Sequence, residues 1–281
     1  MSRTRTLAAA TLLLAALSAP AVASGTGDAA PDDLPTSGEG ATMGSTLPVE
    51  EPGSVTAFGR APIDPVAELT HGPYGVDTSG HTTIEDWQWF TDHSAQFVWI
   101  KATEGTYLAT DSFSDQWKGA TEQGMLRGSY HFANPEVSSG RQQAEYFVAH
   151  RGGWSPDGRT LPGALDMEYN PYGPVCYGKS QAEMAAWARD FITRYEELTG
   201  VKPVVYTNAH WWNTCVGTAD FSDVKLWLAR YSSAPGIAPK SWSMHGATHT
   251  IWQAYPVDAH GYDVNRVHGD RADLERLARR G

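Results

Sequence analysis

The stretch Leu161-Pro-Gly-Ala-Leu-Asp-Met-Glu-Tyr-Asn170 carries two acids two positions apart, directly after a short apolar run. On a β-strand, residues two apart project from the same face, so Asp166 and Glu168 are predicted to stand side by side, about 6.6 Å apart at their Cα atoms. Two buried acids on one strand face repel each other and lose hydration, which is tolerable only where the strand meets water or a substrate. An exposed edge strand is the alternative. The Pro- and Gly-rich turn after Asn170 favours a strand that ends at the mouth of a pocket.

Paired acids of this kind suit the cleavage of a glycosidic bond. One carboxyl group protonates the leaving oxygen, and a second carboxylate stabilises the positive charge that develops on the sugar. Glu168 is the predicted general acid, with Asp166 as its partner.

The first part of the chain is predicted to lie outside the folded domain. Residues 1–23 are typical of a secretory signal peptide, because Arg3 and Arg5 precede an apolar run too short to span a membrane. Residues 24–70 hold six Pro, seven Gly and eight acids but only one basic residue, which is typical of a disordered linker or pro-segment. We therefore expect a secreted, extracellular protein whose catalytic domain spans residues 71–281.

Strand-like and helix-like segments alternate from Tyr74 onward. The predicted strands are Tyr74–Asp77, Phe97–Ala102, Met125–Phe132, Leu161–Glu168, Pro203–Thr207, Leu226–Tyr231, Thr250–Tyr255 and Tyr262–Val264. The predicted helices are Ile84–His93, Phe113–Gln123, Gln142–His150, Gln181–Thr199 and Arg271–Arg280. About eight strands in this alternation indicate an α/β fold, a single-domain parallel β/α barrel with reduced helices in its second half. A doubly wound open sheet is the alternative.

Active sites of such barrels lie at the carboxyl ends of the strands. Asp77 ends the first predicted strand and Asp263 lies on the eighth, so both are expected to join the two acids of the fourth strand. Tyr130 and His131, near the end of the third strand, are expected to line the same pocket. A buried structural histidine is the alternative for His131.

Aromatic side chains are dense late in the chain. Flat rings with a polar edge suit the apolar faces of sugar rings in an open cleft. Trp211 and Trp212 fall in a predicted loop, where both are hard to bury, so we expect them beside such a cleft. Trp252 and Tyr255 are further candidates, whereas Trp227 is expected in the core.

The two cysteines, Cys176 and Cys215, are predicted to form a disulfide, because secreted chains commonly pair their cysteines. The disulfide is expected to tie the loop after the fourth strand to the Trp211-Trp212 loop. Two free buried thiols are the alternative.

Other classes of function have little support in the sequence. Residues 71–281 hold 18 basic and 24 acidic side chains, with no basic stripe for nucleic acid. We find no P-loop, dinucleotide fingerprint or Gly-x-Ser-x-Gly elbow, and no His pair on a helix with zinc-ligand spacing. The expectation is a monomer with no cofactor, no catalytic metal, no nucleic acid partner and no membrane partner.

Several motifs, taken in order, resemble one known family. They are Gly75-Val-Asp-Thr-Ser79, Ile100-Lys-Ala-Thr-Glu-Gly105, Arg127-Gly-Ser-Tyr-His-Phe132, Leu165-Asp-Met-Glu168, Val205-Tyr-Thr207, Trp211-Trp-Asn-Thr-Cys215 and Trp252-Gln253. The combination resembles the family 25 glycoside hydrolases, the CH-type lysozymes or N-acetylmuramidases, and most of all their secreted actinobacterial members. The family often has His-Trp-Gln where this chain has Gly80-His-Thr82, so one aromatic contact at the rim of the site is not expected.

The resemblance implies a flattened β/α barrel that cleaves the β-1,4 bond between N-acetylmuramic acid and N-acetylglucosamine in bacterial peptidoglycan. It implies that Glu168 is the proton donor and that Asp166, Asp77 and Asp263 are the other acids of the site. It also implies that Tyr206 and Trp252 lie near the bound sugar. A chitinase-like glycosidase and a non-catalytic wall-binding module are the competing interpretations. Four acids around one pocket argue against a mere binder.

Overall fold

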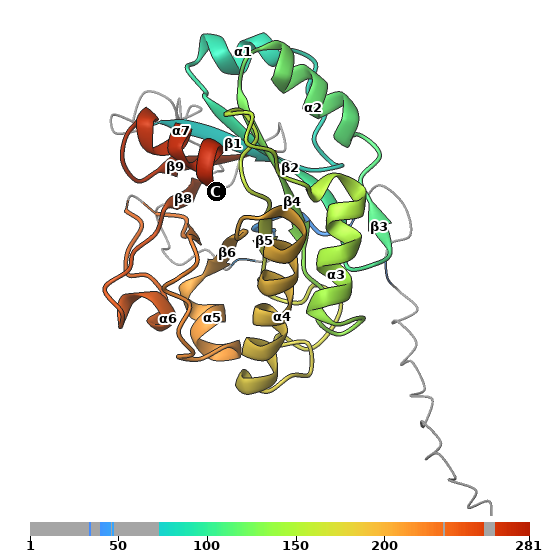
Figure 1. The fold of residues 1–281 in the computed structure, drawn as a ribbon, viewed down its shortest axis with the longest axis vertical. Coiled ribbons are helices and arrows are strands. Elements are labelled where there is room, and N and C mark those ends of the chain that lie inside the picture. The colour runs from blue at the N-terminus through green and yellow to red at the C-terminus, as the bar shows by residue number, and fades with distance from the viewer. Residues whose placement is uncertain (1–33, 35–39, 46, 48–72, 233, 256–261) are drawn as a thin grey trace, which may run out of the picture.

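The computed structural model describes residues 34, 40–45, 47, 73–232, 234–255 and 262–281 (Figure 1). Within these residues, eight strands close into one barrel, because β1 pairs with both β9 and β2. The barrel strands are β1 (Tyr74–Thr78), β2 (Phe97–Glu104), β4 (Leu126–Phe132), β5 (Ala164–Asp166), β6 (Val204–Asn208), β7 (Leu226–Ala229), β8 (Ile251–Tyr255) and β9 (Asp263–Val267). A short strand outside the barrel, β3 (Leu108–Ala109), pairs with the end of β2. The predicted barrel with about eight strands is confirmed.

The barrel is mixed, which corrects the prediction of an all-parallel one. Its last strand, β9, runs antiparallel to both of its neighbours, β1 and β8. A parallel return needs a crossover of about a dozen residues or more. Only residues 256–262 separate β8 from β9, so the chain returns antiparallel.

Helices lie around the barrel in both halves of the chain, and the longest of them falls in the second half (Figure 1). They are α1 (Trp87–Asp92), α2 (Phe113–Glu122), α3 (Gly140–Phe147), followed by a π-helical turn η1 (Val148–Gly152), α4 (Gln181–Thr199), α5 (Ala209–Cys215), α6 (Lys240–Ser243) and α7 (Arg271–Arg280). The longest, α4, starts with a capping box between Ser180 and Glu183 and ends at Gly200, whose φ is 82°. Among the described residues, we find no helix with the length and apolar character needed to cross a membrane.

Side chains alternate along the strands between two cores. In β2, Val98 and Ile100 pack outward against the helices, whereas Phe97 and Trp99 face the barrel interior. Helix α7 closes one end of that interior. Its Leu274, Leu277 and Ala278 join a cluster with residues at the amino ends of the strands, including Phe97, Leu126, Val204 and Ile251. The carboxyl ends are therefore the end of the barrel at which a site can open.

Candidate active site

The two acids of the central stretch face the barrel interior. Asp166 is the last residue of β5, and Glu168 follows two positions after the strand, not on it as predicted. The backbone stays extended there, because Met167 N donates to Tyr206 O at 2.9 Å. Leu165 and Met167 pack in the outer core, so Asp166 and Glu168 point the other way. Both acids are fully buried.

Asp166 is a fully buried acid with no hydrogen-bond partner among the residues that the structure describes. Neither of its carboxyl oxygens is hydrogen bonded to any part of the chain that the structure describes. Burial raises the pKa of Asp166 well above its ordinary value, and the charge of Glu168 raises it further, while the ammonium of Lys101 acts against both. An orphaned buried carboxyl group is costly unless a ligand supplies the missing partner.

Asp77 and Asp263 form a second pair of acids, held by amides. Gln253 Nε2 donates to Asp77 Oδ2 at 3.0 Å and to Asp263 Oδ2 at 3.1 Å. Asn265 Nδ2 donates to the same oxygen of Asp77 at 2.6 Å. Burial raises the pKa of Asp77 to about 7, although the hydrogen bonds from Asn265 and Gln253 act in the opposite direction.

Two tyrosines fix the amide of Gln253. The hydroxyl of Tyr206 donates to Gln253 Oε1 at 2.6 Å, and the hydroxyl of Tyr231 lies 3.2 Å from the same oxygen, so the nitrogen of Gln253 is turned toward the acids. Sequence reasoning quoted Gln253 only within a motif, and it missed Tyr231 and Asn265. A usable signal existed for Asn265, which stands two positions after Asp263 and therefore on the same strand face.

A buried ion pair lies beside these acids. Lys101 Nζ is 2.6 Å from Glu104 Oε2, and both side chains are buried. The hydroxyls of Tyr107 and Tyr172 donate to Glu104 Oε1 at 2.7 and 2.5 Å. Burial lowers the pKa of Lys101, while the charges of Glu104, Asp166 and Glu168 raise it. Lys101 and Glu104 belong to one of the motifs of the sequence, but no role was predicted for them.

A cavity of about 390 Å³ opens at this end of the barrel. Its lining on the barrel side is Asp77, Thr78, Ser79, His81, Tyr130, Tyr231, Tyr262 and Asp263, and residues 42–45 complete it. Burial raises the pKa of Tyr130, and the charges of Asp77, Asp166 and Asp263 add to this. The charges of Glu168, Asp166 and Asp77 likewise add to the raised pKa of the buried Tyr206. Tyr130, Tyr206 and the four predicted acids therefore lie close together, although only Asp77, Asp263 and Tyr130 among them line the cavity itself.

His131 does not reach this cavity. Its neighbour Tyr130 faces inward, so the histidine faces the outer layer. There its ring nitrogens lie 2.8 Å from Thr103 Oγ1 and 2.9 Å from Gln143 Oε1, and its ring stacks on Phe191. Burial lowers the pKa of His131 to about 3. The expectation that His131 lines the pocket is corrected to a neutral structural histidine.

The tryptophans predicted beside an open cleft are buried instead. The expected loop is helix α5, which turns Trp211 and Trp212 into the outer core, both with 0% exposure. Trp211 Nε1 donates to Val175 O at 2.9 Å. The location of Trp211 therefore does not fit the expected role in sugar binding.

Trp252 and Tyr255 both belong to strand β8, as its second and its last residue. Trp252 lies on the face of β8 opposite to Gln253, and its Nε1 donates to Arg230 O at 2.8 Å. This places its ring away from the acids, contrary to expectation. The side chain of Tyr255 lies outside the described residues.

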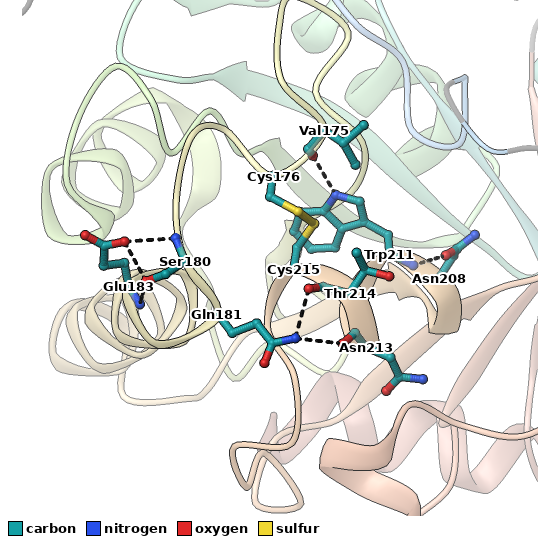
Figure 2. The surroundings of a disulfide bond; sticks show 10 residues. All are labelled: Val175, Cys176, Ser180, Gln181, Glu183, Asn208, Trp211, Asn213, Thr214 and Cys215. Atoms are coloured by element: carbon teal, nitrogen blue, oxygen red, sulfur yellow. Dashed lines mark hydrogen bonds between the residues drawn. A yellow bond between two sulfur atoms is a disulfide. The ribbon is translucent and has the colours of Figure 1, made fainter.

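The predicted disulfide between Cys176 and Cys215 is confirmed, with 5.3 Å between the Cα atoms (Figure 2). It ties the loop after β5 to the last residue of α5. Gln181 Nε2 reinforces the junction by donating to Thr214 O at 3.0 Å (Figure 2). Burial raises the pKa of the next residue, Tyr177, and the charges of Glu168 and Asp166 raise it further. Tyr177 therefore lies near these two acids. The disulfide therefore anchors a loop that borders the site.

Comparison with known proteins shows the family. Residues 76–256 match the Glycosyl hydrolases family 25. The N,O-diacetylmuramidase of Chalaropsis sp is 43% identical over 210 residues, which cover 73% of this chain and 98% of the relative. Lysozyme M1 of Streptomyces globisporus is 40% identical, covering 74% of this chain and 72% of the relative. The crystal structure of the bacterial lysozyme from Streptomyces coelicolor is 40% identical with a TM-score of 0.71, covering 75% of this chain and 98% of that one. The chain therefore belongs to glycosyl hydrolase family 25 and is a glycoside hydrolase.

Proposed function

We propose that this chain is a secreted, monomeric lysozyme that hydrolyses the β-1,4 bond between N-acetylmuramic acid and N-acetylglucosamine in peptidoglycan. The observation that carries the proposal is the pair Asp166 and Glu168, buried side by side and facing the mouth of the barrel. The relatives named as muramidase and lysozyme support the substrate class.

Glu168 is the proton donor in this proposal. As the bond between C1 of the muramic acid residue and the leaving oxygen breaks, the Glu168 carboxyl group gives its proton to that oxygen. Asp166 stands on the same side of the sugar, so it cannot attack from the opposite face as the nucleophile of an ordinary retaining glycosidase does. We therefore assign its unpartnered oxygens to the N–H of the 2-acetamido group of the substrate.

The acetamido group then supplies the nucleophile. Its carbonyl oxygen bonds to C1 while the leaving group departs, and Asp166 stabilises the positive charge that forms on the ring. Asp263 adds negative charge to the same mouth, and Asp77 does so once the pH exceeds its raised pKa of about 7. Water then attacks C1, gives a proton to the Glu168 carboxylate and restores the acetamido group. Two inversions at C1 give net retention of the β configuration, with no bond between sugar and enzyme.

The test combines two readouts on purified peptidoglycan and on a short soluble muropeptide. Mass spectrometry of the new reducing ends should find N-acetylmuramic acid, and real-time NMR should show the β anomer first. An α-configured first product, or a fluorosugar trapped on Asp77, Asp166 or Asp263, would contradict the mechanism. Equal cleavage of chitin oligosaccharides would favour the chitinase-like alternative.

A further inference from the structure

Part of the N-terminal segment lies inside the catalytic cleft. The backbone N–H of Gly44 donates to Glu168 Oε1 at 2.6 Å, and the hydroxyl of Tyr231 donates to Gly44 O at 3.1 Å. Both hydrogen bonds are buried. A leaving oxygen must come within hydrogen-bond reach of Glu168 to receive its proton. In this structure a peptide group occupies that place.

A second set of contacts holds the segment further along the cleft. Ala41 N donates to Glu104 Oε2 at 2.9 Å, and the ammonium of Lys101 donates to Ala41 O. His81 Nε2 donates to Gly40 O at 2.8 Å.

The side chain between these anchors is apolar and buried. Met43 is 1% exposed and belongs to the interior cluster of the barrel, together with Tyr130 and Tyr206. Its burial removes a thioether side chain from water at the one end of the barrel that α7 leaves uncovered. The segment is therefore held by polar contacts at both ends and by apolar packing in the middle.

Two glycines allow this fit. Gly40 and Gly44 have positive φ, of 31° and 78°. A Cβ atom on Gly44 would lie 2.1 Å from the hydroxyl of Tyr231 and 2.9 Å from Gln253 Oε1. A Cβ atom on Gly40 would lie 2.1 Å from Glu104 Oε2. Both the backbone and the space of the cleft require glycine at these positions.

We propose that residues 40–45 form an autoinhibitory strap, which occupies the substrate cleft and must leave it before peptidoglycan can bind. This inference rests on the proposed function, since it takes Glu168 as the proton donor. The strap and the barrel belong to one chain, so docking of the strap is an intramolecular event that dilution of the protein does not weaken.

The strap is distinct from the barrel fold. The family match begins at residue 76, and a relative with 98% of its length covered corresponds to only 75% of this chain. The barrel of that relative therefore closes without such an extension, and a change in the strap should leave the barrel folded.

Two matched variants of the full chain test the strap. Gly44→Ala adds one methyl group where it collides with the cleft, and Gly153→Ala adds one methyl group at an exposed glycine outside the site, where nothing lies within 4 Å of the added atom. On a soluble muropeptide, Gly44→Ala should raise kcat/KM about tenfold, the gain expected when a strap that is docked about nine-tenths of the time is displaced. Gly153→Ala should match the wild type. Equal kcat/KM for Gly44→Ala and the wild type would overturn the proposal.

Hydrogen exchange and binding give readouts that do not depend on turnover. Amides of residues 40–47 should be protected in the wild type and exchange freely in Gly44→Ala. Free exchange in the wild type would overturn the strap. Protection in the wild type, with calorimetric binding of the muropeptide about tenfold tighter in Gly44→Ala than in the wild type, would support it. If Gly44→Ala bound the muropeptide more tightly but did not hydrolyse it, the proposed function would be wrong and the autoinhibitory strap would still be supported.

Discussion

Asp77 and Asp263 stand opposite each other in the antiparallel pairing of β1 with β9, and one amide nitrogen, Gln253 Nε2, donates to both carboxyl groups. The antiparallel return of β9 creates this relationship, because it brings the start of the last strand to the carboxyl end of the first. Residues 186 positions apart in the chain thereby share a donor. The proposed chemistry of the site depends on such arrangements of buried acids, and a substitution can test each arrangement separately.

The buried Asp77 should make stability depend on pH. Its pKa is raised from 3.8 to about 7, so between these values the folded chain holds a proton that the unfolded chain has lost. Stability is then fully present below about pH 4 and falls as pH rises to about 7, by on the order of 4 kcal/mol from this group. Denaturant unfolding at several pH values should show a smaller decrease for Asp77→Asn than for the wild type. Parallel curves for the two proteins would mean that Asp77 titrates normally.

Gln253 should matter for turnover more than for folding. Gln253→Leu removes the donor shared by Asp77 and Asp263, and we expect kcat to fall roughly 10²-fold, similar to the loss of one donor in a polar active site. Gln143→Leu is the matched control, since Gln143 is also a buried, hydrogen-bonded glutamine but contacts His131 in the outer layer. The control should lose stability and keep its kcat. Steady-state kinetics with thermal melts of both variants separates the two effects, and an equal fall in kcat would refute this placement of the site.

The disulfide should contribute to stability and to the order of the loop that carries Tyr177. Its sequence separation of 39 residues corresponds to about 4 kcal/mol in the chain-entropy model. The double variant Cys176→Ser, Cys215→Ser should therefore unfold at a clearly lower denaturant concentration. Thiol titration of the denatured, unreduced wild type should find no free thiol, and two free thiols would contradict the assignment.

Features encoded by neighbouring residues were predictable from the sequence. Helix α4 has the bounds that were predicted, Gln181–Thr199, because its capping box and Gly200 are local signals. Asp77 and Asp166 were predictable because each lies at or near the carboxyl end of a predicted strand, and Glu168 because it stands two positions beyond Asp166. Asp263 was predicted on the same ground, but it is the first residue of β9 and reaches that end of the barrel because β9 runs antiparallel.

Features that depend on distant contacts were missed. Helix α5 was expected to be a loop, and it buries Trp211 against Val175 across 36 positions of sequence. The strap has no apolar periodicity, and its contact with Glu168 spans 124 positions. The role of Gln253 was also missed, although the sequence contained a local signal for it. Gln253 is a polar residue within the otherwise apolar strand Ile251–Tyr255.

The most direct test of the account is the turnover of a short muropeptide by Glu168→Gln, measured against Glu122→Gln, which changes an exposed glutamate on α2 in the same way. Glutamine keeps the size and shape of the side chain but cannot donate the proton, so we expect turnover to fall about 10²–10⁴-fold, with melting temperature and polymer binding retained. The control should keep the turnover of its parent. Near wild-type turnover by Glu168→Gln would remove Glu168 from the mechanism and contradict the account.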